Sequence, residues 1–210
     1  MKHLEQKVAQ SLLQIKAIKL QPANSFTWAS GWKSPIYCDN RKTLSYPEIR
    51  NLLKENFAQV VTEKFDKPDF IAGVATGAIA IGALVADALN LPFVYVRPKP
   101  KEHGLGNQIE GEIPEGKKVV VIEDLISTGK SSLKAVEALR NQNIKVIGMV
   151  AIFTYGFKIA EDNFKKANIS LKTLSNYNQL LQFALQTGYI KESDLETLNQ
   201  WRENPEVWGK

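Results

Sequence analysis

The sequence lacks the residues that mark secreted and membrane proteins. Its only cysteine, Cys38, cannot form a disulfide within the chain and fits a reducing cytoplasm. No apolar run approaches the roughly 18 residues of a membrane-spanning helix. Glu5 and Lys7 interrupt the N-terminal stretch, which is therefore unlike a secretory signal peptide. We expect a cytoplasmic protein that does not associate with a membrane.

Charge of one sign is not concentrated in any part of the chain. The 27 lysines and arginines are interspersed with 22 acids, which gives a formal net charge of +5. Without a basic block, nucleic acid is not an expected partner, whereas a modest positive charge suits a small polyanionic substrate. Repeats, low-complexity segments and linker-like stretches are also missing. We therefore expect residues 1–210 to form a single domain with its own core.

Hydrophobic spacing after Pro68 predicts strands that alternate with helices. The predicted elements are strands at 70–74, 93–96, 119–122 and 145–153, and helices at 78–89 and 128–142. The tail adds a helix around 162, a strand at 170–174 and a helix from 179. Such alternation is typical of a parallel α/β sheet, in which ligands bind beyond the carboxyl ends of the strands.

The residues before Pro68 follow another pattern. Four apolar residues recur at helical spacing and predict an amphipathic opening helix: Leu4, Val8, Leu12 and Ile15. Residues 20–40 indicate short β-prone pieces. Capping boxes at 45–48 and at 193–196 are predicted to start a central helix and the last helix of the chain.

The most informative stretch runs from Val119 to Ser132. An apolar strand leads into two adjacent acids, Glu123 and Asp124, and then into a small, hydroxyl-rich turn before a helix. Free N–H groups at a helix start favour a phosphate, and acids beside them suit a polyol or a metal-bound group of the same ligand. A Walker A loop would need a glycine where Asp124 stands. An ordinary strand-to-helix turn is the plain alternative.

This stretch resembles the phosphoribosyl pyrophosphate (PRPP) signature of the class I phosphoribosyltransferases. The resemblance implies a Rossmann-like parallel sheet flanked by helices, the type I phosphoribosyltransferase fold. It also implies that the two acids hold the ribose hydroxyls and that the turn holds the 5′-phosphate. The residues so assigned to PRPP are Glu123, Asp124, Leu125, Ile126, Ser127, Thr128, Gly129, Lys130 and Ser131.

A second stretch, from Val96 to Asn107, combines a strand end with a basic loop. Two prolines forbid a helix and two glycines allow movement, so the loop is either a functional lid or a solvated surface loop. Its Arg-x-x-x-Lys-x-His-Gly pattern resembles the catalytic loop of the orotate phosphoribosyltransferases. That resemblance assigns PRPP contacts to Arg97, Lys101 and His103. It assigns catalytic roles to Lys101, His103 and Asp124.

A third stretch, from Phe26 to Asp39, indicates by itself a β-hairpin with an aromatic face, which core packing alone would also explain. Its Phe-Thr-x-x-Ser-Gly-x-Lys-Ser-Pro-x-Tyr pattern resembles the N-terminal hood of the same enzymes, which holds the pyrimidine. The resemblance places hood elements at about 1–40 and in the C-terminal region. It assigns orotate contacts to Tyr37 and Ser127.

The chain also departs from better-known relatives. Those carry lysine where this sequence has Ala29, Gly77 and Pro98, and an orotate-binding arginine in the region of Phe153–Phe157. Those contacts are therefore not carried over to this chain.

Together the three stretches imply the transfer of a phosphoribosyl group from PRPP to orotate. The resemblance further implies Mg²⁺ held mainly by PRPP, with no direct protein ligand, and a homodimer with shared active sites. A purine phosphoribosyltransferase and a non-catalytic PRPP-sensing regulator are the alternatives. The hood and the His103 loop favour the orotate enzyme over the purine enzyme. The retained acids, with Lys101 and His103, favour it over the regulator.

Overall fold

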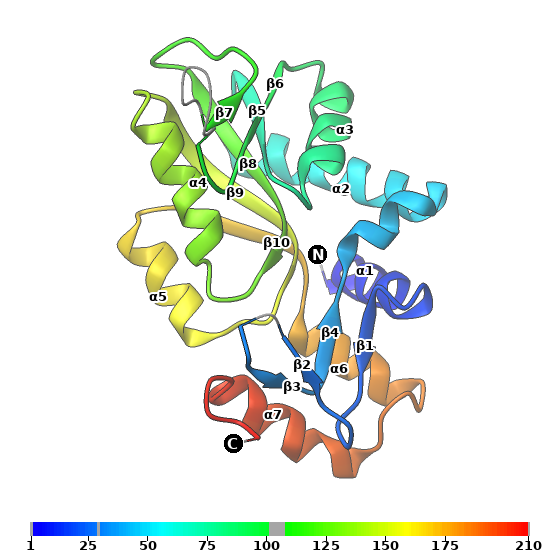
Figure 1. Cartoon of the computed structure of the whole chain (residues 1–210). Helices are drawn as coiled ribbons and strands as arrows, with labels where there is room; N and C mark the ends of the chain where they lie inside the picture. Colours follow the sequence, from blue (N-terminus) through cyan, green and yellow to red (C-terminus); the bar gives the residue numbers. More distant parts are fainter. Residues whose placement is uncertain (1, 29, 101–107, 210) are drawn as a thin grey trace.

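The computed structural model describes residues 2–28, 30–100 and 108–209. Its centre is a six-stranded sheet in the order β10-β9-β8-β5-β6-β7, parallel throughout except for the edge pairing of β7 with β6. The strands are β5 (Phe70–Val74), β6 (Phe93–Val96), β7 (Ile109–Glu110), β8 (Lys118–Ile126), β9 (Lys145–Thr154) and β10 (Leu171–Asn176). The predicted parallel α/β sheet is confirmed (Figure 1).

Helices connect these strands and cover the sheet. They are α1 (Lys2–Gln14), α2 (Pro47–Lys64), α3 (Ile79–Leu89), α4 (Lys130–Arg140), α5 (Lys158–Lys166), α6 (Tyr177–Gln186) and α7 (Leu195–Glu203), with the 3-10 helices η1 (Asn40–Ser45) and η2 (Glu192–Asp194). Within the described ranges, no helix is both long and apolar enough to cross a membrane.

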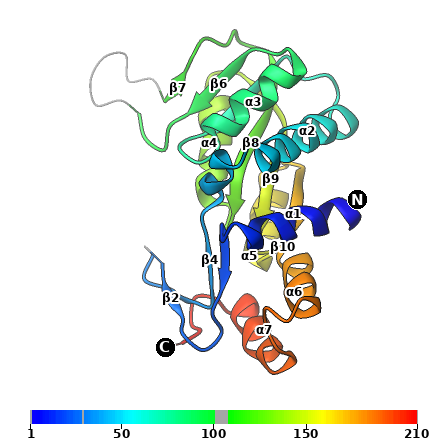
Figure 2. The ribbon, with the colours of Figure 1, turned by 90° about the vertical axis from the view of Figure 1, so that its right-hand side faces the viewer.

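A small β unit, the hood, extends from the sheet. It consists of β1 (Ile18–Leu20), β2 (Phe26–Thr27), β3 (Lys33–Ser34) and β4 (Ile36–Cys38). Strand β1 pairs antiparallel with β4, and β2 pairs with β3 in the predicted hairpin. Figure 2 shows the hood next to the C-terminal part of the chain, at the end of the molecule far from α2 and α3. Segments from both ends of the chain therefore meet there.

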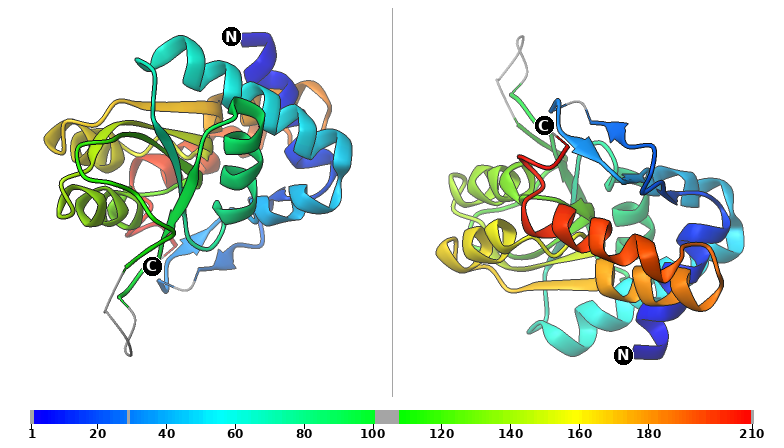
Figure 3. Two further views of the ribbon diagram at one scale, coloured as in Figure 1. Left: turned by 90° about the horizontal axis from the view of Figure 1, so that it is seen from above. Right: turned by 90° about the horizontal axis from the view of Figure 1, so that it is seen from below.

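The sequence of β8 explains a core on both faces of the sheet. Side chains of a strand alternate between faces, so Val119 and Val121 pack with α4 and α5, while Val120 and Ile122 pack with the other helices. All four are fully buried. Figure 3 (left) shows the two layers, with α4 and α5 in yellow-green and yellow on one side and the cyan and blue helices on the other. A continuous apolar run is what such a strand requires.

Strand β8 is longer than the sequence predicts. It runs to Ile126, through both acids, instead of ending at Ile122. Strand β9 supplies the reason, since it pairs with β8 as far as Thr154 opposite Ile126. The edge strand β7 was also not predicted.

Neither predicted capping box forms. Ser45 is the last residue of η1, so the N-cap of α2 is Tyr46, and Pro47 provides the first helical position. Ser193 lies inside η2, where Asp194 Oδ2 accepts from the backbone N–H of Lys191 at 2.9 Å. In both places a preceding 3-10 turn shifts the helix start.

Candidate active site

The two acids of β8 point to opposite faces of the sheet. Glu123 continues the row that faces α4, where Ser132 Oγ donates to Glu123 Oε2 at 2.7 Å. Asp124 lies instead against Gly77, directly before α3. The two-residue period of a strand therefore gives two neighbouring acids different surroundings.

Glu123 is buried, with 4% of its surface exposed. Its second oxygen, Oε1, accepts from the backbone N–H of Asp124 at 2.9 Å. Burial, together with the neighbouring charge of Asp124, raises the pKa of the Glu123 carboxyl well above its usual value. In this arrangement Glu123 braces the backbone of Asp124, and its direct contact with PRPP stays a prediction.

We expect Glu123→Gln to make stability less dependent on pH. Because the folded pKa is raised, the folded protein keeps a proton that the unfolded chain releases above about pH 4.3. Wild-type stability should therefore fall as pH rises from there through the folded pKa. Glutamine has no titrating proton; its oxygen can accept from the Asp124 N–H and its NH2 group can donate to Ser132 Oγ. Urea unfolding of both proteins at about pH 5 and about pH 8 measures the difference. Parallel pH dependences would contradict the raised pKa.

Asp124 occupies the space beside Gly77. A Cβ at Gly77 would overlap the Asp124 carboxylate, so position 77 has no room for a side chain while the acid lies there. Both residues border a cavity of about 290 Å³, the acidic pocket. It is lined by Val74, Ala75, Thr76, Gly77, Glu123, Asp124, Leu125, Ser127, Thr128, Gly129 and Ser131.

The turn from Ser127 to Gly129 forms one wall of the acidic pocket. Gly129 is the N-cap of α4 with a φ of +76°, where glycine is favoured. A Cβ there would also approach the ring of Phe164 to 2.7 Å. Asn163 Nδ2 of α5 donates to the carbonyl of Thr128 at 3.0 Å and holds the turn in place. The free N–H groups at the start of α4 border the pocket in an arrangement that suits a phosphate.

A second cavity, the aromatic pocket, has a volume of about 400 Å³ and lies under the hood. It is lined by Thr27, Trp28, Tyr37, Cys38, Leu125, Ser127 and Tyr155. Trp28 stacks on Tyr155 with ring centroids 5.2 Å apart. The two predicted orotate contacts, Tyr37 and Ser127, both belong to this pocket. Leu125 and Ser127 also border the acidic pocket, so the two cavities adjoin.

A third cavity, the basic pocket, has a volume of about 380 Å³. The residues it shares with the acidic pocket are Val74, Ala75 and Ser131. Its cationic lining residues are Arg97, Lys99, Lys130 and Lys134. Arg97 also pairs with Glu110 at 3.6 Å. Lys101 and His103 lie outside the described residues, so their predicted roles stay predictions.

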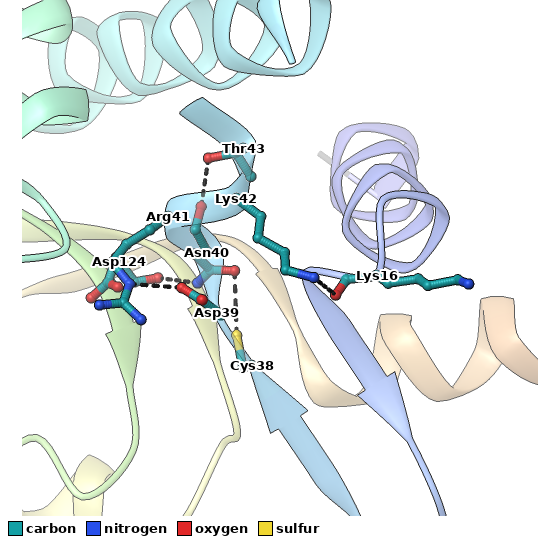
Figure 4. A network of polar contacts seen from close by, with 8 residues as sticks. All are labelled: Lys16, Cys38, Asp39, Asn40, Arg41, Lys42, Thr43 and Asp124. Atoms are coloured by element: carbon teal, nitrogen blue, oxygen red, sulfur yellow. Dashed lines mark hydrogen bonds and ion pairs between the residues drawn. The ribbon is translucent and has the colours of Figure 1, made fainter. Parts of the chain in front are cut away.

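Sequence reasoning missed the residues that directly follow the hood. Asn40 Nδ2 donates to the carbonyl oxygen of Asp124 at 2.6 Å. Arg41 follows Asn40 in η1, and its Nε donates to Asp39 Oδ1 at 2.7 Å (Figure 4). The Asp39 contact, and less strongly the charge of Asp124, raise the pKa of Arg41. The only signal in the sequence is that these polar residues follow the hood pattern immediately.

The chain is similar to known proteins over nearly its whole length. The model of the phosphoribosyl transferase domain family matches residues 42–187. The chain is 65% identical over 208 residues to an orotate phosphoribosyltransferase of Bacteroides thetaiotaomicron, across 99% of this chain and 98% of the relative. It is 62% identical over 209 residues to an orotate phosphoribosyltransferase of Porphyromonas gingivalis, across 100% of both chains.

A solved structure supports the same assignment. The crystal structure of the orotate phosphoribosyltransferase from Aeropyrum pernix matches with a TM-score of 0.75 at 27% identity, covering 88% of this chain and 99% of that chain. The predicted type I phosphoribosyltransferase fold is therefore confirmed. Sequence relatives over the full length and a structural neighbour agree, and the chain belongs to the orotate phosphoribosyltransferase family.

Proposed function

We propose that this protein transfers the phosphoribosyl group of PRPP to orotate, which gives orotidine 5′-monophosphate and pyrophosphate for pyrimidine (UMP) biosynthesis. The observation that carries the proposal is the junction of the aromatic and acidic pockets at Leu125 and Ser127. A planar base in the first pocket would lie beside a ribose in the second, as bond formation between them requires. The names of the full-length relatives support orotate as the base.

In this proposal the acidic pocket holds the phosphoribosyl group. The turn at the start of α4 binds the 5′-phosphate through backbone N–H and hydroxyl groups. Asp124 binds the ribose hydroxyls, and Glu123 holds Asp124 from the opposite face of β8. Positive charge grows on the ribose as the bond to pyrophosphate breaks, and the Asp124 carboxylate stabilises that charge.

The negative charges of orotate and PRPP need cations nearby. Among the described residues that line the aromatic and acidic pockets there is no lysine or arginine. Arg41 lies close enough to Asp124 for the charge of Asp124 to raise its pKa. We therefore assign Arg41 as the cation between the aromatic and acidic pockets. Arg97 and the basic pocket serve the pyrophosphate. Lys101 adds charge there, and His103 donates a proton to the departing oxygens.

Mg²⁺ is the cofactor in this proposal. In the part of the chain that the structure describes, no group of three or more His, Cys, Asp or Glu side chains could hold a metal ion. The acids of the acidic pocket are Glu123 and Asp124, and both Glu123 oxygens already accept hydrogen bonds. This donor set fits an ion held mainly by PRPP oxygens. Bound there, Mg²⁺ would neutralise charge on the leaving pyrophosphate.

We further propose a cytoplasmic homodimer in which the loop between β6 and β7 completes the site of the partner. β6 ends at Val96, which lines the basic pocket. After the loop, β7 pairs antiparallel with β6, with Ile109 opposite Val96. Both ends of this loop therefore lie at the same edge of the sheet.

A spectrophotometric assay with orotate, PRPP and Mg²⁺ tests the proposed reaction. The protein should consume orotate and release pyrophosphate, and a purine base in place of orotate should not react. Consumption of a purine instead would identify the purine enzyme. PRPP binding without turnover of either base would indicate a regulator.

Ser127→Leu should weaken the binding of orotate and PRPP together. Ser127 borders both the aromatic and the acidic pocket, so a leucine there would fill space that both ligands need. Calorimetry should show each affinity lowered by about 10-fold or more. Ser170→Leu, at an exposed position before β10, is the matched control. Unchanged affinities in Ser127→Leu would show that the turn does not hold the substrates.

A further inference from the structure

The backbone of Asp124 lies where β8 has a neighbouring strand on one side only. Strand β5 pairs with β8 only as far as Gly73 opposite Ile122. Beyond that point β8 keeps only β9 as a neighbour, up to Thr154. Asp124 therefore lies in a part of β8 that has a neighbouring strand on one side only, between the pairs Glu123–Ala151 and Leu125–Phe153. On the side where β5 has ended, groups from other parts of the chain have to contact it.

Two side chains make hydrogen bonds with the backbone of Asp124. Glu123 Oε1 accepts from the N–H of Asp124 at 2.9 Å. Asn40 Nδ2 donates to the Asp124 carbonyl at 2.6 Å, as Figure 4 shows. Asn40 starts η1, lies 84 positions earlier in the chain, and has 2% of its surface exposed. Two side chains thus make hydrogen bonds to the peptide groups on either side of the Asp124 Cα.

The amide oxygen of Asn40 contacts a residue that lines the aromatic pocket. Cys38 Sγ donates to Asn40 Oδ1 at 3.3 Å, and Cys38 lines that pocket. Burial, with the nearby charges of Asp124 and Asp39, raises the pKa of the Cys38 thiol well above its usual value, so the thiol keeps its proton near neutral pH. Hydrogen bonds therefore connect the wall of the aromatic pocket to the backbone of Asp124.

We propose that Asn40 is a positioning residue that holds Asp124 in place for the ribose and links it to the aromatic pocket. The inference rests on the proposed function, which gives Asp124 the task of stabilising the ribose. Without Asn40 Nδ2, the Asp124 carbonyl would lose this hydrogen bond, and β9 alone would hold the end of β8. A small displacement of the acid relative to the ribose is enough to lower the rate.

A double-mutant cycle tests whether Asn40 acts through Asp124. Asn40→Leu removes both amide contacts and should lower kcat/KM by about 10- to 100-fold. In an Asp124→Asn background the same change should lower it by less than about 3-fold, because the group that Asn40 positions is already disabled. Equal losses in the two backgrounds would overturn the proposal.

Thr43→Val is the matched control. Thr43 Oγ1 donates to the backbone carbonyl of Asn40 at 2.6 Å, and Thr43 is buried in the same 3-10 helix. The valine variant loses this bond but keeps both contacts of the Asn40 side chain. Its kcat/KM should stay within about 2-fold of wild type even if its Tm falls. A loss as large as that of Asn40→Leu would assign the effect to the stability of η1 and overturn the proposal.

The single cysteine provides a readout that does not depend on activity. The infrared S–H stretching band of Cys38 reports its hydrogen bond to Asn40 Oδ1 without interference from other thiols. This band should shift to higher frequency in Asn40→Leu and stay in place in Thr43→Val. A band that does not move in Asn40→Leu would overturn the link to the aromatic pocket.

Asn40→Asp keeps the proposal testable if the leucine variant does not fold. An aspartate carboxylate cannot donate to the Asp124 carbonyl, whereas its protonated form can. The ratio of variant to wild-type kcat/KM should therefore rise as pH falls, and a flat ratio would overturn the proposal.

The same double-mutant cycle of Asn40→Leu and Asp124→Asn is repeated with PRPP affinity as the measured quantity, by calorimetry with Mg²⁺. A wild type that binds PRPP but does not convert orotate would contradict the proposed function, and the affinity cycle would then decide the role of Asn40. A wild type that neither converts orotate nor binds PRPP would overturn both.

Discussion

Asp124→Asn is expected to lower kcat/KM by about 100-fold or more, with little change in stability. Asparagine has the shape of aspartate and fits beside Gly77, but it lacks the charge that stabilises the ribose in the transition state. The bonds from Glu123 and Asn40 go to the backbone of Asp124, so the substitution leaves them in place. Steady-state kinetics and thermal unfolding of one preparation measure the two effects.

Asp162→Asn is the matched control for this change. Asp162 belongs to α5, pairs with Lys158 at 2.9 Å and borders none of the three pockets. Its variant should keep wild-type activity. Near-normal turnover of Asp124→Asn would show that this carboxylate does not stabilise the ribose charge.

Mixing the inactive variants Lys101→Ala and Asp124→Asn should restore activity. If the loop of one subunit completes the site of the other, each mixed dimer has one site with both residues intact and one with both changed. Random pairing then makes about one quarter of all sites intact. The mixture should therefore approach about a quarter of wild-type activity, far above either variant alone.

Subunit exchange has to be verified, by mass spectrometry of differently tagged subunits. A mixture of Asp124→Asn with Ser127→Leu is the control, because both residues line the acidic pocket of one chain and no mixed dimer gains an intact site. If the Lys101→Ala mixture stays as inactive as its components after exchange, each loop serves its own subunit.

The central strands could be predicted closely because burial on both faces leaves a plain apolar signal. Strands β5 and β6 have the bounds that the sequence predicts. The end of β8 could not be predicted, because Glu123 and Asp124 look like loop residues in an apolar pattern. Ser132 Oγ donates to Glu123 inside the fold, so the strand continues through two adjacent acids. A polar residue extends a buried strand when a partner from another element is present.

The candidate site divides in the same way. Tyr37 and Ser127 belong to local motifs, and the structure brings them together in one pocket. Asn40 could not be identified from the sequence, since its contact with Asp124 joins positions 84 apart and depends on where β5 stops. Pattern reasoning finds residues that share a motif and misses residues that only the tertiary fold brings to it.

The packing of Trp28 has a consequence for the newly synthesised chain. Its ring contacts Trp201 of α7 edge to face, with centroids 5.7 Å apart, as well as Tyr155. All strands of the sheet precede α7 in the chain and leave the ribosome before it. All residues of the acidic pocket therefore leave the ribosome before α7, whereas Trp28 gains its contact with Trp201 only after α7 has emerged.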